Sequence, residues 1–133
     1  MKKKWSLLFI LILALTVVLT ACGGGGGETT DSAAKAGEEL FAQTVIGSQA
    51  GCATCHSLEA GVVIVGPSMA GIGSRAGSTV SGQSAEEYLK DSILHPDSHL
   101  VEGFPAGTMS QVWGDELSSE QVDQLVAYLL TLK

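Results

Sequence analysis

Basic residues are scarce beyond the first four positions of this chain. Between residues 22 and 133 the basic side chains are Lys35, Arg75, Lys90 and Lys133, whereas all fourteen acidic residues lie there, so this part has a net charge of −10. Nucleic-acid phosphates would repel such a surface, which excludes nucleic acid as a partner. The excess of acid would instead steer a basic partner protein, or would simply keep the surface soluble.

The chain also lacks the alternating apolar and polar residues of a sheet. Residues 62–65, VVIV, fit a short strand, but they are too few and too isolated to imply a sheet. No internal repeat is present. The periodicity instead predicts three helices joined by long, glycine-rich loops, and therefore an all-α fold.

The ends of these helices are marked in the sequence. The first is expected to begin at Asp31 or Ser32, and the second to stop before Pro96. The second and third helices each begin with a capping box, in which a serine is followed three positions later by Glu or Gln. These boxes are Ser84 with Glu87, and Ser118 with Gln121.

Three helices in about a hundred residues make a thin core, because domains of this size bury proportionally little surface. We therefore expect a further group to fill the middle. Gly37 lies inside the first helix, where glycine is unfavourable, which indicates that another backbone approaches closely there.

Long apolar runs are confined to the N-terminus. Residues 2–4 are lysines, residues 7–15 are continuously apolar, and LTAC at 19–22 resembles the lipobox of bacterial lipoproteins. We expect a signal peptide at 1–21, a lipidated Cys22 followed by a flexible glycine-rich linker to residue 31, and a folded domain at 32–133. An uncleaved membrane anchor with a free cysteine is the alternative. Either arrangement tethers the domain outside the bacterial cytoplasmic membrane.

The stretch GCATCHSLEAG, residues 51–61, contains Cys52, Cys55 and His56. A thiol–disulfide site needs a βαβ context that is missing. A zinc site is possible with His95 and His99, although the spacing is too long for a zinc finger and His56 is left unused. C-x-x-C-H is the attachment signature of c-type haem, in which both thiols bind the porphyrin and the histidine binds the iron. This hypothesis uses all the residues of the motif.

Haem iron needs a second axial ligand, and methionine is the usual one in electron carriers. Met69 follows His56 too closely to reach the other face of a haem, whereas Met109 comes after the middle helix and is the better candidate. Either His95 or His99 in place of Met109 is a further alternative.

The domain resembles class I cytochrome c from about Ala34 to Lys133. GEELF (37–41) and LVAYLLTLK (125–133) are similar to the terminal helices of that family, and GPSMAGIGSRAG (66–77) to its GPxLxGxxGR loop. VEGFPAGTM (101–109) resembles the axial-methionine loop, especially that of cytochrome c domains in subunit II of haem–copper oxidases. The interval between Phe41 and Cys52 is longer than the family usually has, which suggests an elaboration beside the haem edge.

The resemblance implies an all-α class I cytochrome c fold around one covalent haem c. It also implies roles for four further residues. The carbonyl of Pro67 would accept the ring N–H of His56, and Met69 would take a core position rather than bind iron. Arg75 and Trp113 would contact the haem propionates, although Arg75 also fits a solvated loop cation and Trp113 fits simple core packing.

The expected function is therefore that of a membrane-tethered carrier of single electrons in a respiratory or photosynthetic chain, donating to a terminal oxidase or a similar acceptor, and not an enzyme. Two alternatives stay open. A haem enzyme or gas sensor would have an axial ligand that is easily displaced from the iron. A zinc-stabilised binding lipoprotein would contain no iron.

Overall fold

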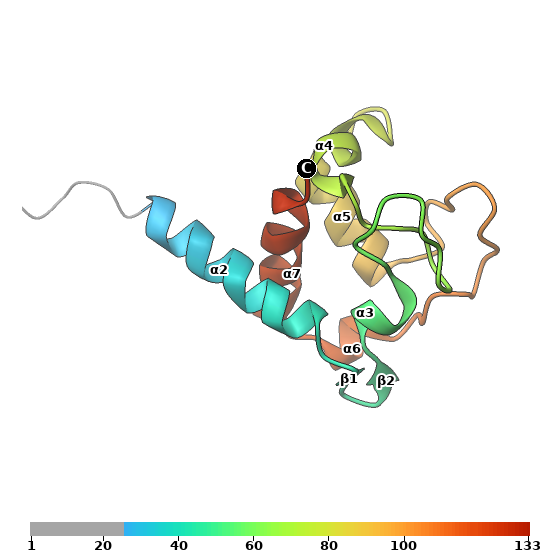
Figure 1. Ribbon diagram of the computed structural model, residues 1–133, viewed down its shortest axis with the longest axis horizontal. Coiled ribbons are helices and arrows are strands. Elements are labelled where there is room, and N and C mark those ends of the chain that lie inside the picture. The colour runs from blue at the N-terminus through green and yellow to red at the C-terminus, as the bar shows by residue number, and fades with distance from the viewer. Residues whose placement is uncertain (1–25) are drawn as a thin grey trace, which may run out of the picture.

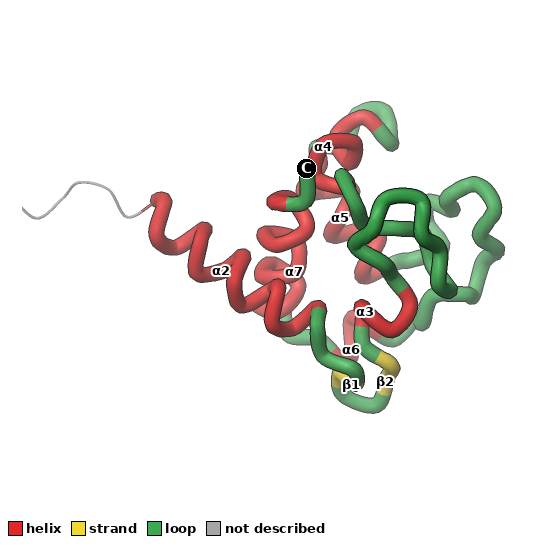
Figure 2. Tube along the Cα trace, viewed as in Figure 1, coloured by secondary structure: helices red, strands yellow, loops and turns green. Residues whose placement is uncertain are grey.

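Helices provide most of the regular structure in the computed structural model, which describes residues 26–133 (Figure 1). The three longest are α2 (Gly26–Phe41), α5 (Ala85–Leu94) and α7 (Ser119–Thr131). The shorter elements are β1 (Val45–Ile46), β2 (Gln49–Ala50), α3 (Cys52–Cys55), α4 (Ile72–Arg75), the 3₁₀ helix η1 (Ala76–Ser78) and α6 (Trp113–Glu116). Long loops connect them (Figure 2), and the predicted all-α class is confirmed.

The first helix begins earlier than expected. α2 starts at Gly26 rather than at Asp31 or Ser32, so the final part of the predicted linker is helical. Adding a turn to an existing helix costs little because its nucleus is already formed, and a capping residue therefore does not always end it. The predicted signal peptide at 1–21 and the predicted lipidation site at Cys22 lie outside the described residues.

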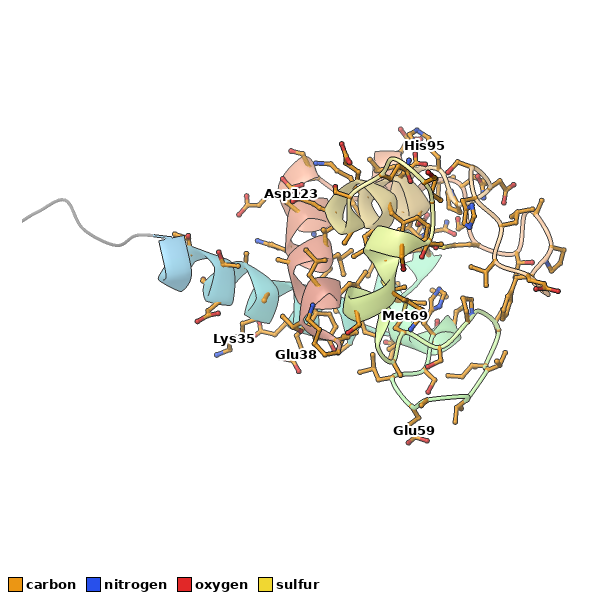
Figure 3. All side chains as sticks on the ribbon, turned by 90° about the horizontal axis from the view of Figure 1, so that it is seen from above. Lys35, Glu38, Glu59, Met69, His95 and Asp123 are labelled. Carbon is orange, nitrogen blue, oxygen red and sulfur yellow. The ribbon has the colours of Figure 1, made fainter. Side chains whose placement is uncertain are left out.

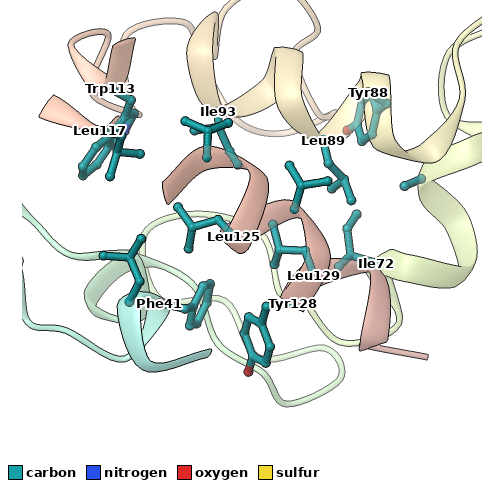
Figure 4. Packing of buried hydrophobic residues seen from close by; sticks show 14 of the residues in the cluster. Phe41, Ile72, Tyr88, Leu89, Ile93, Trp113, Leu117, Leu125, Tyr128 and Leu129 are labelled. Carbon is teal, nitrogen blue, oxygen red and sulfur yellow. The ribbon is translucent and has the colours of Figure 1, made fainter. Parts of the chain in front are cut away.

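α2 and α7 cross at very short range. A Cβ atom at Gly37 would lie 1.9 Å from the backbone oxygen of Gln124, so only glycine fits there. Beside this crossing the rings of Phe41 and Tyr128 pack with their centroids 5.5 Å apart (Figure 4). The close backbone approach expected at Gly37 is thus confirmed.

Both predicted capping boxes form, and each sets the start of a helix. Ser84 accepts a hydrogen bond from the amide of Glu87, and Ser118 accepts one from the amide of Gln121. α7 then presents its predicted apolar positions to the core, where α2, α4 and α5 pack against it. The buried residues of α7 are Val122, Leu125, Val126, Tyr128 and Leu129.

The prediction of a possible strand at residues 62–65 is wrong, because these four residues form an exposed loop. The amides of Val65 and Gly66 donate instead to the oxygen of Cys55, at 3.2 and 2.9 Å, so these two amides are not available to pair with another strand. The short hairpin of β1 and β2 lies in the interval before Cys52. Within residues 26–133 no helix has both the length and the apolar composition that a membrane span requires.

Candidate functional site

Cys52 and Cys55 form the two ends of α3, a single helical turn. The turn is held by Gly51, whose backbone oxygen accepts hydrogen bonds from the amide of Thr54 at 3.1 Å and from its hydroxyl at 2.6 Å. Residues three positions apart lie on the same face of a helix, so both thiols are presented in one direction. Both cysteines are free and partly buried.

The ring of His56 is oriented from two sides. Its Nδ1 lies 2.8 Å from the oxygen of Pro67, and a ring nitrogen that faces a carbonyl must carry the proton. The other nitrogen, Nε2, is then the one with a lone pair for a metal. On another side Gly66 lies so close that a Cβ would be 2.5 Å from Cε1 of the ring. The structure therefore contains the hydrogen bond that the resemblance implied for Pro67.

Cys52, Cys55 and His56 line a cavity of about 520 Å³ in the middle of the molecule. This volume lies within the range of about 300–1,000 Å³ that is typical of cofactor and ligand pockets. The cavity is mainly apolar, and its walls come from β2, from each α-helix from α2 to α7 and from the loops between them. Among the apolar residues that line it are Phe41, Ile72, Leu89, Ile93, Leu125 and Leu129 (Figure 4).

Both candidate methionines reach this cavity. Met69 (Figure 3) follows Pro67 by two residues. Its amide donates to the oxygen of Ser57 at 2.8 Å, so its backbone is bonded to the segment around His56. Met109 comes from the separate loop that connects α5 to α6. Both side chains pack against the core cluster.

Trp113 and Arg75 were expected near the haem propionates, and they differ in whether their N–H groups already have hydrogen-bond partners. The indole Nε1 of Trp113 is buried and has no hydrogen-bond partner in the part of the chain that the structure describes, although Trp113 lines the cavity. An unpaired buried donor costs about 1–3 kcal/mol, so this one is suited to an acceptor on a bound group. Arg75 also lines the cavity, but its guanidinium donates to the oxygen of Ser68 at 2.8 Å and to that of Ala70.

Neither competing hypothesis for the two cysteines finds support in this geometry. Burial raises the pKa of the Cys52 thiol to about 11, whereas redox-active cysteines have lowered pKa values. No three His, Cys, Asp or Glu side chains converge on a possible metal position within residues 26–133. His95 is exposed and bonds Asp91 at 2.8 Å (Figure 3), while His99 packs edge-on against Tyr88.

Among the polar residues at the cavity that were missed from the sequence, two are bonded to each other. The side-chain oxygen of Gln49, on β2, accepts a hydrogen bond of 2.9 Å from the hydroxyl of Ser110, and both residues line the cavity. The unusual length of the interval between Phe41 and Cys52 was the one signal that pointed to this region.

The residues present fit a covalently attached haem. Two thiols on one turn, a histidine with Nε2 available, two methionines at the same cavity, apolar walls and an unpaired buried donor all match its chemistry. Residues 34–133 match the family model described as "Cytochrome c". The chain is also similar to cytochrome c2 iso-2 of Magnetospirillum molischianum, with 30% identity over 89 residues that cover 62% of this chain and 91% of that protein. No solved structure matches the chain.

Because the family model covers nearly all of the folded domain, and because the helical fold and the C-x-x-C-H turn agree with it, the chain belongs to the cytochrome c family, as a class I, single-haem member with covalently bound haem c.

Proposed function

We propose that this cytochrome works as an electron carrier tethered to the outer face of the bacterial cytoplasmic membrane, and that it donates electrons to a terminal oxidase or a similar acceptor. Tethering is supported by the lipobox-like LTAC at residues 19–22 and by the apolar run before it. The start of α2 lies at the opposite end of the molecule from the loops around residues 57–66 and 100–108 (Figure 1). A tether joined to α2 would therefore leave those loops free to meet partners.

His56 and Met109 are the proposed axial ligands. The observation that carries this proposal is the hydrogen bond between Nδ1 of His56 and Pro67, because it leaves Nε2 as the metal-binding nitrogen. Met109 is favoured over Met69 because the backbone of Met69 is bonded to the segment that carries His56. The bound haem supplies a single-electron redox centre, and His/Met ligation raises its potential relative to other ligand pairs. A high potential suits donation to a terminal oxidase.

The proposed partners present basic docking surfaces. The region from residue 22 onward has a net charge of −10, and one of its four basic side chains, Lys90, is already paired with Asp123 at 2.7 Å. Steering by such a charge weakens as salt screens it. Electron transfer to a basic acceptor should therefore slow as ionic strength rises, whereas a surface that is acidic only for solubility would show little salt dependence.

We propose no enzymatic activity, because this chain supplies both axial ligands itself. An optical spectrum of the protein matured with its haem tests this, oxidised and reduced, with and without carbon monoxide. A c-type spectrum that carbon monoxide leaves unchanged supports a carrier, whereas a rapid shift would favour an enzyme or gas sensor. Met109→Ala should create carbon monoxide binding and Met69→Ala should not; the reverse result would exchange their roles.

Metabolic labelling with a radioactive fatty acid tests the tether. The wild type should carry the label and Cys22→Ala should not, if Cys22 is lipidated. If the wild type is in the membrane fraction without the label, the N-terminal segment is an uncleaved anchor instead.

A further inference from the structure

The hairpin of β1 and β2 lies in the interval between Phe41 and Cys52, which is longer than is usual in the family. Electron transfer by itself does not require this extra segment. Its strands pair Val45 with Ala50 and Ile46 with Gln49. The amide of Gly51 closes it by donating to the oxygen of Thr44 at 2.9 Å. The next residue is Cys52, so the hairpin is directly continuous with the haem-attachment turn.

Side chains at the tip of the hairpin are bonded to the segment that follows Met109. Gln49 accepts the hydroxyl of Ser110 through its side-chain oxygen at 2.9 Å, and its amide group donates to the hydroxyl of Ser48 at 3.0 Å. Ser48 in turn donates from its amide to the carboxylate of Glu116 at 3.2 Å, and its hydroxyl bonds the same carboxylate. A continuous chain of hydrogen bonds therefore joins the hairpin to both ends of residues 110–116.

The loop that carries Met109 has little else to hold it. Its other hydrogen bonds are internal; for example, the amide of Gly107 donates to the carboxylate of Asp97 at 3.0 Å. This loop comprises residues 95–112, between α5 and α6. Residues 100–111 hydrogen-bond to only one residue outside the loop in the described part of the chain, and that residue is Gln49. Residues 101–103 and 105–108 are exposed and bury little apolar surface. Met109 itself packs against the core.

We propose that Gln49 and Ser110 are positioning residues that hold Met109 at the cavity, so that the hairpin couples the haem-attachment turn to the axial-methionine loop. This inference rests on the proposed ligation by Met109. Exogenous ligands reach the iron only when the loop opens, so their apparent affinity depends on the fraction of molecules in which it is open. Loss of the bond between Gln49 and Ser110 increases that fraction.

Imidazole binding to the oxidised, haem-loaded protein tests the inference. A hydrogen bond of this kind contributes modestly, so Ser110→Ala should bind imidazole about two- to tenfold more tightly than the wild type. Ser110→Thr keeps the hydroxyl and should behave as the wild type. Ser78→Ala is the matched control: its hydroxyl bonds the oxygen of Arg75 at 2.9 Å, away from the loop, and its imidazole affinity should not change.

A second variant keeps the test decisive if Ser110→Ala fails to mature. Gln49→Leu should raise imidazole affinity by at least the factor expected for Ser110→Ala, because it also loses the bond to Ser48. The double variant should not exceed Gln49→Leu, because both single variants lose the bond between Gln49 and Ser110. Amide hydrogen exchange at Gly107 should be faster in each. Unchanged imidazole affinity in both single variants, or effects that multiply in the double variant, would overturn the inference.

Met109→Ala separates this inference from the proposed ligation. If Met109→Ala tightens imidazole binding and the Ser110 and Gln49 variants do not, the ligation stands and the positioning role is wrong. If Met109→Ala leaves imidazole binding unchanged, Met109 is not the ligand and both proposals are wrong.

Discussion

Replacing Gly66 by alanine tests how His56, the proposed iron ligand, is held. A Cβ at this position would lie 2.5 Å from Cε1 of His56 and 3.1 Å from Nε2, and real Cβ contacts essentially never fall below 3.0 Å. The ring, the backbone at residue 66 or both must therefore shift by about 0.5 Å in total. Because Nδ1 lies 2.8 Å from the oxygen of Pro67, this movement strains that hydrogen bond or the bond from Nε2 to the iron.

The cost follows from the crowding. Overpacking in a packed interior destabilises by about 1–3 kcal/mol. In a domain of this size 1 kcal/mol lowers Tm by about 4–8 °C, so Gly66→Ala should lower it by roughly 5–20 °C. Thermal unfolding of the haem-loaded protein, followed by absorbance, gives the Tm. The spectrum at room temperature reports on the ligation.

Gly114→Ala is the matched control. Its Cβ would meet only the Cδ2 atom of Leu94, at an ordinary 3.9 Å. Because alanine is the better helix former by about 1 kcal/mol, this variant should be as stable as the wild type or slightly more so. If Gly66→Ala unfolds within about 2 °C of the wild type and its spectrum is unchanged, the reasoning is refuted, because that shift corresponds to well under 1 kcal/mol.

Three further predictions concern other parts of the molecule. Gly37→Ala should lower the urea midpoint by the equivalent of about 1–2 kcal/mol, because its Cβ would lie 1.9 Å from the oxygen of Gln124 and the cost of this overlap exceeds the gain in helix propensity; an unchanged midpoint would contradict the close crossing. Trp113→Phe should lower the Tm of the haem-loaded protein if the indole donates to a propionate, whereas an equal or higher Tm would show that this donor stays unpaired. Hydrogen bonds from Ser98 and His95 hold the pKa of the Asp91 carboxyl below its ordinary value. The contribution of the carboxylate to folding is therefore present at about pH 5 and is lost as the pH falls through that lowered pKa, so Asp91→Asn should show a Tm deficit at about pH 5 that vanishes in acid; a deficit that grows in acid would contradict this sign.

The parts of the fold that were predicted correctly are governed by neighbouring residues. Each capping box joins groups three positions apart, and the apolar stripe of α7 repeats with the helical period. The haem-attachment turn is equally local, because both thiols and the histidine lie within five residues. Gly37 was recognised because glycine is costly inside a helix, although the sequence did not name Gln124 as its neighbour. Local rules also misplaced the start of α2, since a residue suited to capping does not oblige a helix to begin there.

The sequence by itself therefore determined the helical class, the attachment turn and the identity of the cofactor. Only the tertiary structure brought Met69 and Met109 to one cavity, left the indole of Trp113 without a partner, and joined Gln49 to Ser110 across 61 positions of the chain. Such contacts depend on how the helices cross and where the loops return. A pattern that extends over a few residues carries no information about side chains that meet only after the whole chain has folded.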